Sequence, residues 1–98
     1  MWIGWIEFDV LLGDVHSLKG KRSVIRPILA ELRRATEASV AEVGEQDLHR
    51  RSVIGVAAIA SAADRVTETL DRAERLVAER PDITLLSARR RMHHSDDD

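Results

Sequence analysis

The chain has 98 residues, which is enough for one domain but too few for two separate hydrophobic cores. Hydrophobic residues make up 44% of it and charged residues 33%, a composition that fits neither a disordered chain nor a membrane protein. The lack of cysteine excludes disulfides, thiolate metal sites and cysteine nucleophiles. A formal charge of -2 gives no overall attraction to nucleic acid, so binding of that kind would need a local basic surface.

Export signals and membrane spans leave recognisable apolar segments in a sequence. The first residues here lack a basic segment followed by an apolar run, and no apolar stretch approaches the roughly 18 residues that a membrane span needs. We therefore expect a cytoplasmic protein without a membrane partner.

Alternation of apolar and polar residues predicts a β-strand over residues 2–12. Ile6, Phe8 and Val10 would share its buried face, because side chains of a strand alternate between two faces. The opposite face would then combine large apolar side chains with two carboxylates: Ile3, Trp5, Glu7, Asp9 and Leu11.

A helix is predicted from Ser17, which can cap it, to about residue 37. Its apolar positions recur at helical spacing: Leu18, Ile25, Ile28, Leu29, Leu32 and Ala35. Gly20 and Pro27 lie inside this helix, and proline removes one backbone hydrogen bond, so we expect a kink or a late start.

The rest of the chain predicts three further strands, one further helix and a tail. Two strands, at residues 39–43 and 52–60, are separated by a polar segment and read as a hairpin. A second helix follows and ends at Pro81, with a buried stripe of Val66, Leu70, Ala73 and Val77. A last strand is predicted over residues 83–90, and residues 93–98 are expected to be a disordered tail.

The resulting order, β-α-β-β-α-β, is that of the ferredoxin-like split βαβ arrangement in the α+β class. We expect one domain over residues 1–92, with a four-stranded antiparallel sheet. Right-handed crossovers would put both helices on one face of the sheet and leave the other face open.

Basic residues are concentrated over residues 16–35 of the first helix region, where Glu31 is the only acidic residue. At about 100° per residue, Lys19, Arg22, Arg26 and Arg33 fall within a narrow arc. Such a row could bind the phosphates of RNA or DNA, and the alternative is a solvated helix face. The candidate nucleic-acid-binding residues are Lys19, Lys21, Arg22, Arg26 and Arg33.

Three carboxylates could serve a metal-dependent hydrolase. Glu7, Asp9 and Glu42 would bind Mg²⁺ if they converged on one sheet face, and the alternative is pairing with Arg50 or Arg51. No nucleophile or base stands at a recognised spacing from them, and no phosphate-binding glycine loop occurs. We therefore expect no enzyme activity, no metal site and no cofactor.

The open sheet face predicts self-association. Ile3, Trp5 and Leu11 would form an apolar patch of the kind that monomers avoid exposing. A two-fold homodimer is the simplest cover for it, with Trp5 as its anchor. A protein-binding module using the same face is the related alternative.

Several motifs resemble those of a known family. They are Ile-Glu-Phe-Asp-Val at residues 6–10, the helix opening Ser17-Leu-Lys-Gly-Lys-Arg22, and Val40-Ala-Glu-Val-Gly-Glu-Gln-Asp47. Across residues 1–92 the sequence is similar to the YlxP-like proteins, a small bacterial family of domains of unknown function. The resemblance implies a ferredoxin-like fold, and its members are commonly encoded beside transcription, translation-initiation and ribosome-maturation factors. It carries over no catalytic residue, and the matching positions with suitable chemistry are Lys19, Lys21, Arg22, Glu42 and Asp47.

These observations favour a non-enzymatic cytoplasmic factor in RNA or ribosome metabolism, which binds phosphates through the basic edge of the first helix. The alternative hypotheses are a self-associating or protein-binding module and a metal-dependent hydrolase built on the three carboxylates. The expected partners are RNA or a ribosomal particle and a second copy of the chain.

Overall fold

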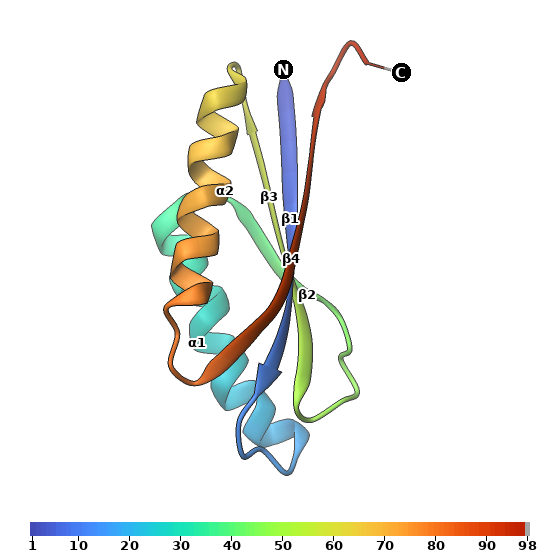
Figure 1. The fold of residues 1–98 in the computed structure, drawn as a ribbon, viewed down its shortest axis with the longest axis vertical. Helices are drawn as coiled ribbons and strands as arrows, with labels where there is room; N and C mark the ends of the chain where they lie inside the picture. The colour runs from blue at the N-terminus through green and yellow to red at the C-terminus, as the bar shows by residue number, and fades with distance from the viewer. Residues whose placement is uncertain (98) are drawn as a thin grey trace.

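The order of strands and helices is β-α-β-β-α-β, which confirms the predicted ferredoxin-like α+β class (Figure 1). A computed structural model describes residues 1–97. Its elements are β1 (Trp2–Leu12), α1 (Leu18–Thr36), β2 (Ser39–Gly44), β3 (Arg51–Ala60), α2 (Ala63–Ala78) and β4 (Ile83–His94).

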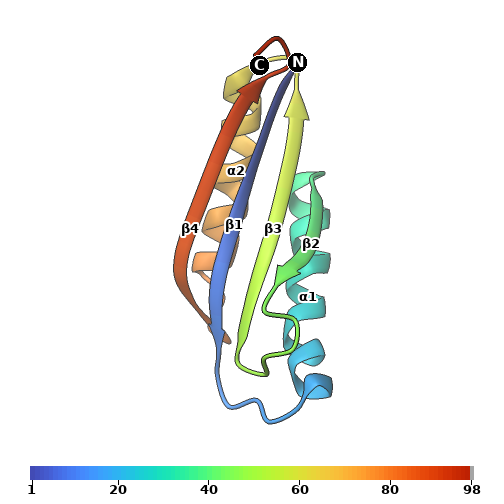
Figure 2. The same cartoon turned by 90° about the vertical axis from the view of Figure 1, so that its right-hand side faces the viewer.

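The sheet is antiparallel with strand order β2-β3-β1-β4, so β1 lies between β3 and β4. Figure 2 shows the four strands side by side with both helices behind them, α2 behind β4 and β1, and α1 behind β2. Both helices therefore cover one face, as the right-handed crossovers predict, and the other face carries no helix.

The core fills the space between the sheet and the helices. Ile6, Phe8 and Val10 of β1 are all 0% exposed, as their alternation predicts. The helices contribute buried stripes at the predicted spacing, namely Ile25, Ile28 and Leu32 from α1 and Val66, Leu70, Ala73 and Val77 from α2. Gly4 lets α2 approach the sheet closely, because a Cβ there would lie 2.5 Å from Cγ1 of Val66.

Helix α1 begins where its cap predicts. The hydroxyl of Ser17 accepts a hydrogen bond from the backbone N–H of Gly20 at 3.0 Å. The expected late start is wrong, since the helix begins at Leu18 and continues through Pro27. It ends at Thr36, and the backbone of the capping residue Glu37 adopts the left-handed conformation with φ 56°.

The last strand is longer than predicted, and the expected tail is wrong for its first residues. β4 extends to His94, with His93 paired to Ile3 and His94 to Trp2. The His93 ring stacks on Trp5 at a centroid distance of 5.4 Å, and His94 meets Trp2 edge-on at 4.9 Å. Backbone partners on β1 and two tryptophan rings therefore order this end, while residue 98 lies outside the described residues.

Neither helix within residues 1–97 has the length and apolar character that a membrane span requires.

Candidate nucleic-acid interface

Three of the predicted phosphate-binding cations are exposed on α1. Lys19, Arg22 and Arg26 all reach solvent, and none of them forms an ion pair with a carboxylate of residues 1–97. Several other basic side chains are paired with carboxylates: Lys21, Arg51, Arg80, Arg89 and Arg90. The exposed cations of α1 are therefore available to an external anion.

The single acidic residue of α1 does not neutralise this row. Glu31 accepts a hydrogen bond from Arg80 at 2.7 Å, and Arg80 also binds Asp82 at 3.0 Å. The hydrogen bond to Asp82 and that to Glu31 raise the pKa of the Arg80 guanidinium. Glu31 is thus satisfied by a residue that follows α2.

Arg33 is only partly free. Its guanidinium donates a hydrogen bond to the carbonyl of Val40 at 2.7 Å and so ties the last turns of α1 to β2. A guanidinium carries five N–H donors, so most of its donors stay available to a ligand. Arg33 therefore remains in the candidate interface, at the end nearest β2.

A groove runs beside the row between α1 and the segment that follows β2. Its volume is about 230 Å³. Arg22 and Arg26 line it together with the apolar side chains Leu18, Ile25 and Leu29. The rest of the lining is Lys21, Glu42 and Gln46. The two guanidinium groups consequently lie beside a surface on which a flat apolar group could rest.

The prediction that Lys21 binds phosphate is wrong. Lys21 is 3% exposed, and its Nζ lies 2.9 Å from Oε2 of Glu42. The same ammonium donates to the carbonyls of Glu45 at 2.6 Å and Gln46 at 3.3 Å, so its three protons are used. Position 21 lies four residues before Ile25 on the buried stripe of α1, and this spacing could have located it from the sequence.

The three candidate carboxylates do not converge. Glu42 is opposite Ile54 on the helix-covered face, where it accepts a hydrogen bond from the buried hydroxyl of Ser52 at 2.6 Å. Glu7 and Asp9 point to the open face, because they alternate with the buried residues of β1. The register of β2, which places Val40 opposite Val56, puts Glu42 on the wrong face for the expected cluster.

Each carboxylate of the open face binds an arginine. Asp9 accepts hydrogen bonds from the Arg51 guanidinium at 2.7, 2.8 and 3.3 Å, and this bonding and the charge of Asp9 raise the pKa of Arg51. Glu7 accepts one from Arg89 at 2.7 Å. Of the two partners considered from the sequence, Arg51 is the one used, while Arg50 donates to the carbonyls of Leu12 and Gly13.

In the part of the chain that the structure describes, no group of three or more histidine, aspartate or glutamate residues is placed to hold a metal ion. Asp47, which the family motif singles out, is exposed in the turn between β2 and β3.

The predicted self-association residues lie on the open face, but they are half-buried rather than exposed. Ile3 and Trp5 are neighbours there, whereas Leu11 lies about 20 Å from Trp5 at the rise of a strand. The most exposed apolar side chains of this face are Ile59 at 66% and Val43 at 53%. The alternation of Ile59 with buried Ile54 and Val56 could have indicated its exposure from the sequence.

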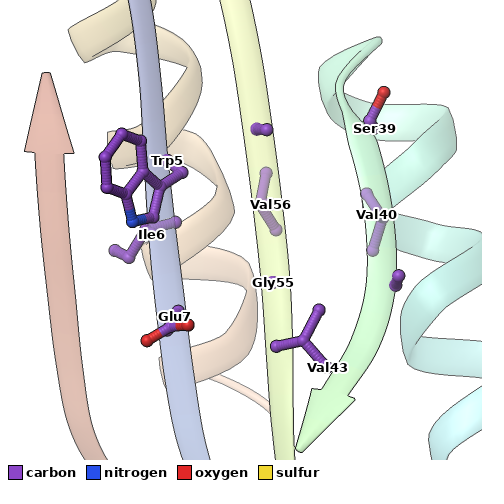
Figure 3. A pocket seen from close by; sticks show the side chains of 10 residues that line it. Trp5, Ile6, Glu7, Ser39, Val40, Val43, Gly55 and Val56 are labelled. Carbon is purple, nitrogen blue, oxygen red and sulfur yellow. The ribbon is translucent and has the colours of Figure 1, made fainter. Parts of the chain in front are cut away.

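A shallow hollow of about 290 Å³ lies on this face between Trp5 and Val43 (Figure 3). Gly55 and Ala57 of β3 form its floor. A Cβ at Gly55 would lie 3.0 Å from Cγ1 of Val43, so the hollow depends on glycine at this position.

Comparison with known proteins identifies the family. The model described as "Protein of unknown function (DUF503)" matches residues 3–90, and the chain therefore belongs to the DUF503 family. A curated relative, the uncharacterized protein YlxP of Bacillus subtilis (strain 168), is 32% identical over 81 residues, which cover 83% of this chain and 88% of the relative. The resemblance to YlxP-like proteins is confirmed.

Among solved structures, a mutant of SnoaB from Streptomyces nogalater aligns with 99% of this chain and 95% of its own. SnoaB is a cofactor-independent oxygenase, the sequence identity is 12% and the TM-score is 0.46.

Proposed function

We propose that the protein is a non-enzymatic cytoplasmic factor in RNA or ribosome metabolism, which binds RNA phosphates through α1. The residues that make the contacts are Lys19, Arg22, Arg26 and Arg33. The observation that carries the proposal is that Lys19, Arg22 and Arg26 are exposed without a carboxylate partner among residues 1–97. An unpaired row of cations attracts a polyanion without first breaking internal ion pairs.

The length of the row suits a nucleic-acid backbone. At 1.5 Å per residue the axial distance from Lys19 to Arg33 is about 21 Å, which spans several phosphates. Arg22 and Arg26 are one turn apart and line the groove beside apolar side chains, against which an unpaired base can rest. This arrangement favours single-stranded RNA segments over a uniform duplex.

RNA is favoured over other polyanions by the family resemblance, since YlxP-like proteins are commonly encoded beside translation and ribosome-maturation factors. The proposal gives the chain no catalytic step, because Glu7, Asp9 and Glu42 are each bound to a basic side chain. The exposed cations of α1 that have no carboxylate partner among residues 1–97 can therefore bind an anion.

Purification from cells under low salt tests the proposal. The wild type should carry ribosomal RNA, measured by absorbance ratio and by sequencing of the bound RNA, and Arg22→Glu/Arg26→Glu should lose it. Arg65→Glu/Arg75→Glu makes the same charge change at exposed arginines of α2 and is the matched control. A wild type that carries no RNA, or equal loss in both double variants, contradicts the proposal.

A further inference from the structure

The open sheet face carries protruding and hollow apolar features side by side. Ile59 and Val43 protrude from it, while Gly55 and Ala57 form the floor of the hollow beside Trp5. Figure 2 shows that no helix covers this face, and Figure 3 shows the hollow between β1 and β2. Trp5 of β1 and Val43 of β2 thus flank the small residues Gly55 and Ala57 of β3, a pattern that a packed partner sheet can match.

We propose that this face binds a second copy of the chain, in a two-fold homodimer with β4 of one copy over β2 of its partner. The proposal goes beyond RNA binding by α1, since it concerns the opposite side of the sheet.

The two carboxylates of β1 would not enter the interface unpaired. Glu7 is already paired with Arg89, and Asp9 forms several hydrogen bonds with Arg51. A carboxylate that keeps its hydrogen-bonded partner avoids much of the penalty of entering an interface unpaired. The two ion pairs therefore enter the interface as neutral units.

The positions of large and small residues favour a second copy of the chain as the partner of this face. Face-to-face packing about an axis parallel to the strands, between β1 and β3, places β1 of one copy over β3 of its partner. Trp5 and Ala57 are directly opposite in the register, so Trp5 of each copy would meet Ala57 and the hollow of the other. Both residues lie on the two central strands, next to this axis.

The unpaired charges at the edges of the sheet favour the same two-fold axis, parallel to the strands. Arg91 and Ser39 lie at the level of Trp5 and Ala57, on opposite edges of the sheet, and Glu37 precedes Ser39 by two residues. Neither Arg91 nor Glu37 forms an ion pair within the described part of the chain. A two-fold axis parallel to the strands brings Arg91 over the β2 edge of the partner, near Glu37 of that copy, so opposite charges meet. A two-fold axis perpendicular to the strands would instead bring β4 over β4 and place arginine near arginine.

Sedimentation equilibrium of the full chain tests the dimer. The wild type should be a dimer at about 20 µM, with a dissociation constant in the micromolar range or below. Ile59→Arg should raise this dissociation constant at least about tenfold. The protomer should still fold with this change, because Ile59 is 66% exposed. Leu48→Arg is the matched control, since Leu48 is 48% exposed outside the sheet and its replacement should leave the dimer intact.

A charge exchange tests the arrangement. Arg91→Glu and Glu37→Arg should each weaken the dimer, and the two together in one chain should restore it. A monomeric wild type overturns the proposal, and so does an Ile59→Arg variant that dimerises as strongly as the wild type. If the double variant does not recover dimerisation, the β4-over-β2 arrangement is wrong. A monomer whose RNA affinity falls in Trp5→Ala would assign the face to RNA and also overturn it. Arg22→Glu/Arg26→Glu should leave the dimer unchanged, so that failure of RNA binding and failure of dimerisation are distinguishable.

Discussion

Lys21 lies in the basic opening of α1 but binds inside the molecule, to Glu42 and to the carbonyls of Glu45 and Gln46. These contacts hold the segment after β2 against the helix. Counting positive charges along the sequence does not distinguish the buried Lys21 from the exposed Arg22. Adjacent residues of a helix point in directions about 100° apart, so one can face the core while the next faces solvent. Part of the family motif therefore has a structural role.

Replacing Lys21 should destabilise the fold. Lys21→Ala leaves Glu42 without its cation and frees two backbone carbonyls, so we expect the free energy of unfolding to fall by about 2–4 kcal/mol. Lys19→Ala, at an exposed position of the same helix, should change it by less than about 0.5 kcal/mol. Urea unfolding followed by circular dichroism measures both. A Lys21→Ala protein as stable as Lys19→Ala would show that the buried contacts contribute little.

At the level of elements, alternation and helical spacing were sufficient to predict all six strands and helices. The buried stripe of α2, from Val66 to Val77, occurs at the expected positions. The end of β4 could not be predicted in this way, because His93 and His94 are ordered by Ile3 and Trp2 at the other end of the chain. Local patterns carry no information on such distant partners.

The packing of α2 on β1 should depend on Gly4. Gly4→Ala would put a Cβ within 2.5 Å of Val66 Cγ1, and we expect destabilisation of about 1–3 kcal/mol by thermal or urea unfolding. Gly13→Ala is the matched control, since nothing lies within 4 Å of a Cβ there. Adding Val66→Ala to Gly4→Ala should recover part of the loss, and the absence of any recovery would contradict the steric explanation.

At the level of the whole molecule, the candidate interface could be predicted only in part. Charge and helical period correctly selected Lys19, Arg22 and Arg26 as exposed cations. The carboxylate cluster could not be assessed from sequence, because the face of Glu42 depends on the register of β2 against β3. The fold itself does not choose a function, since ferredoxin-like domains support many.

The two proposed surfaces lie on opposite sides of the sheet. α1 covers the core face (Figure 2). Trp5, Val43 and Ile59 occupy the open one. A dimer formed through the open face would therefore leave both α1 rows exposed. RNA binding and self-association are compatible in one molecule.

The salt dependence of RNA binding tests the central claim most directly. Four phosphate contacts, from Lys19, Arg22, Arg26 and Arg33, predict that log K against log salt concentration falls with a slope of about -2.8 for a single strand. Arg22→Glu/Arg26→Glu should reduce the affinity and bring the slope to about -1.4 or shallower, because two contacts are removed. Fluorescence anisotropy with a labelled single-stranded RNA measures both quantities. Binding that does not depend on salt, or a slope that the double variant leaves unchanged, would contradict a phosphate-binding role for α1.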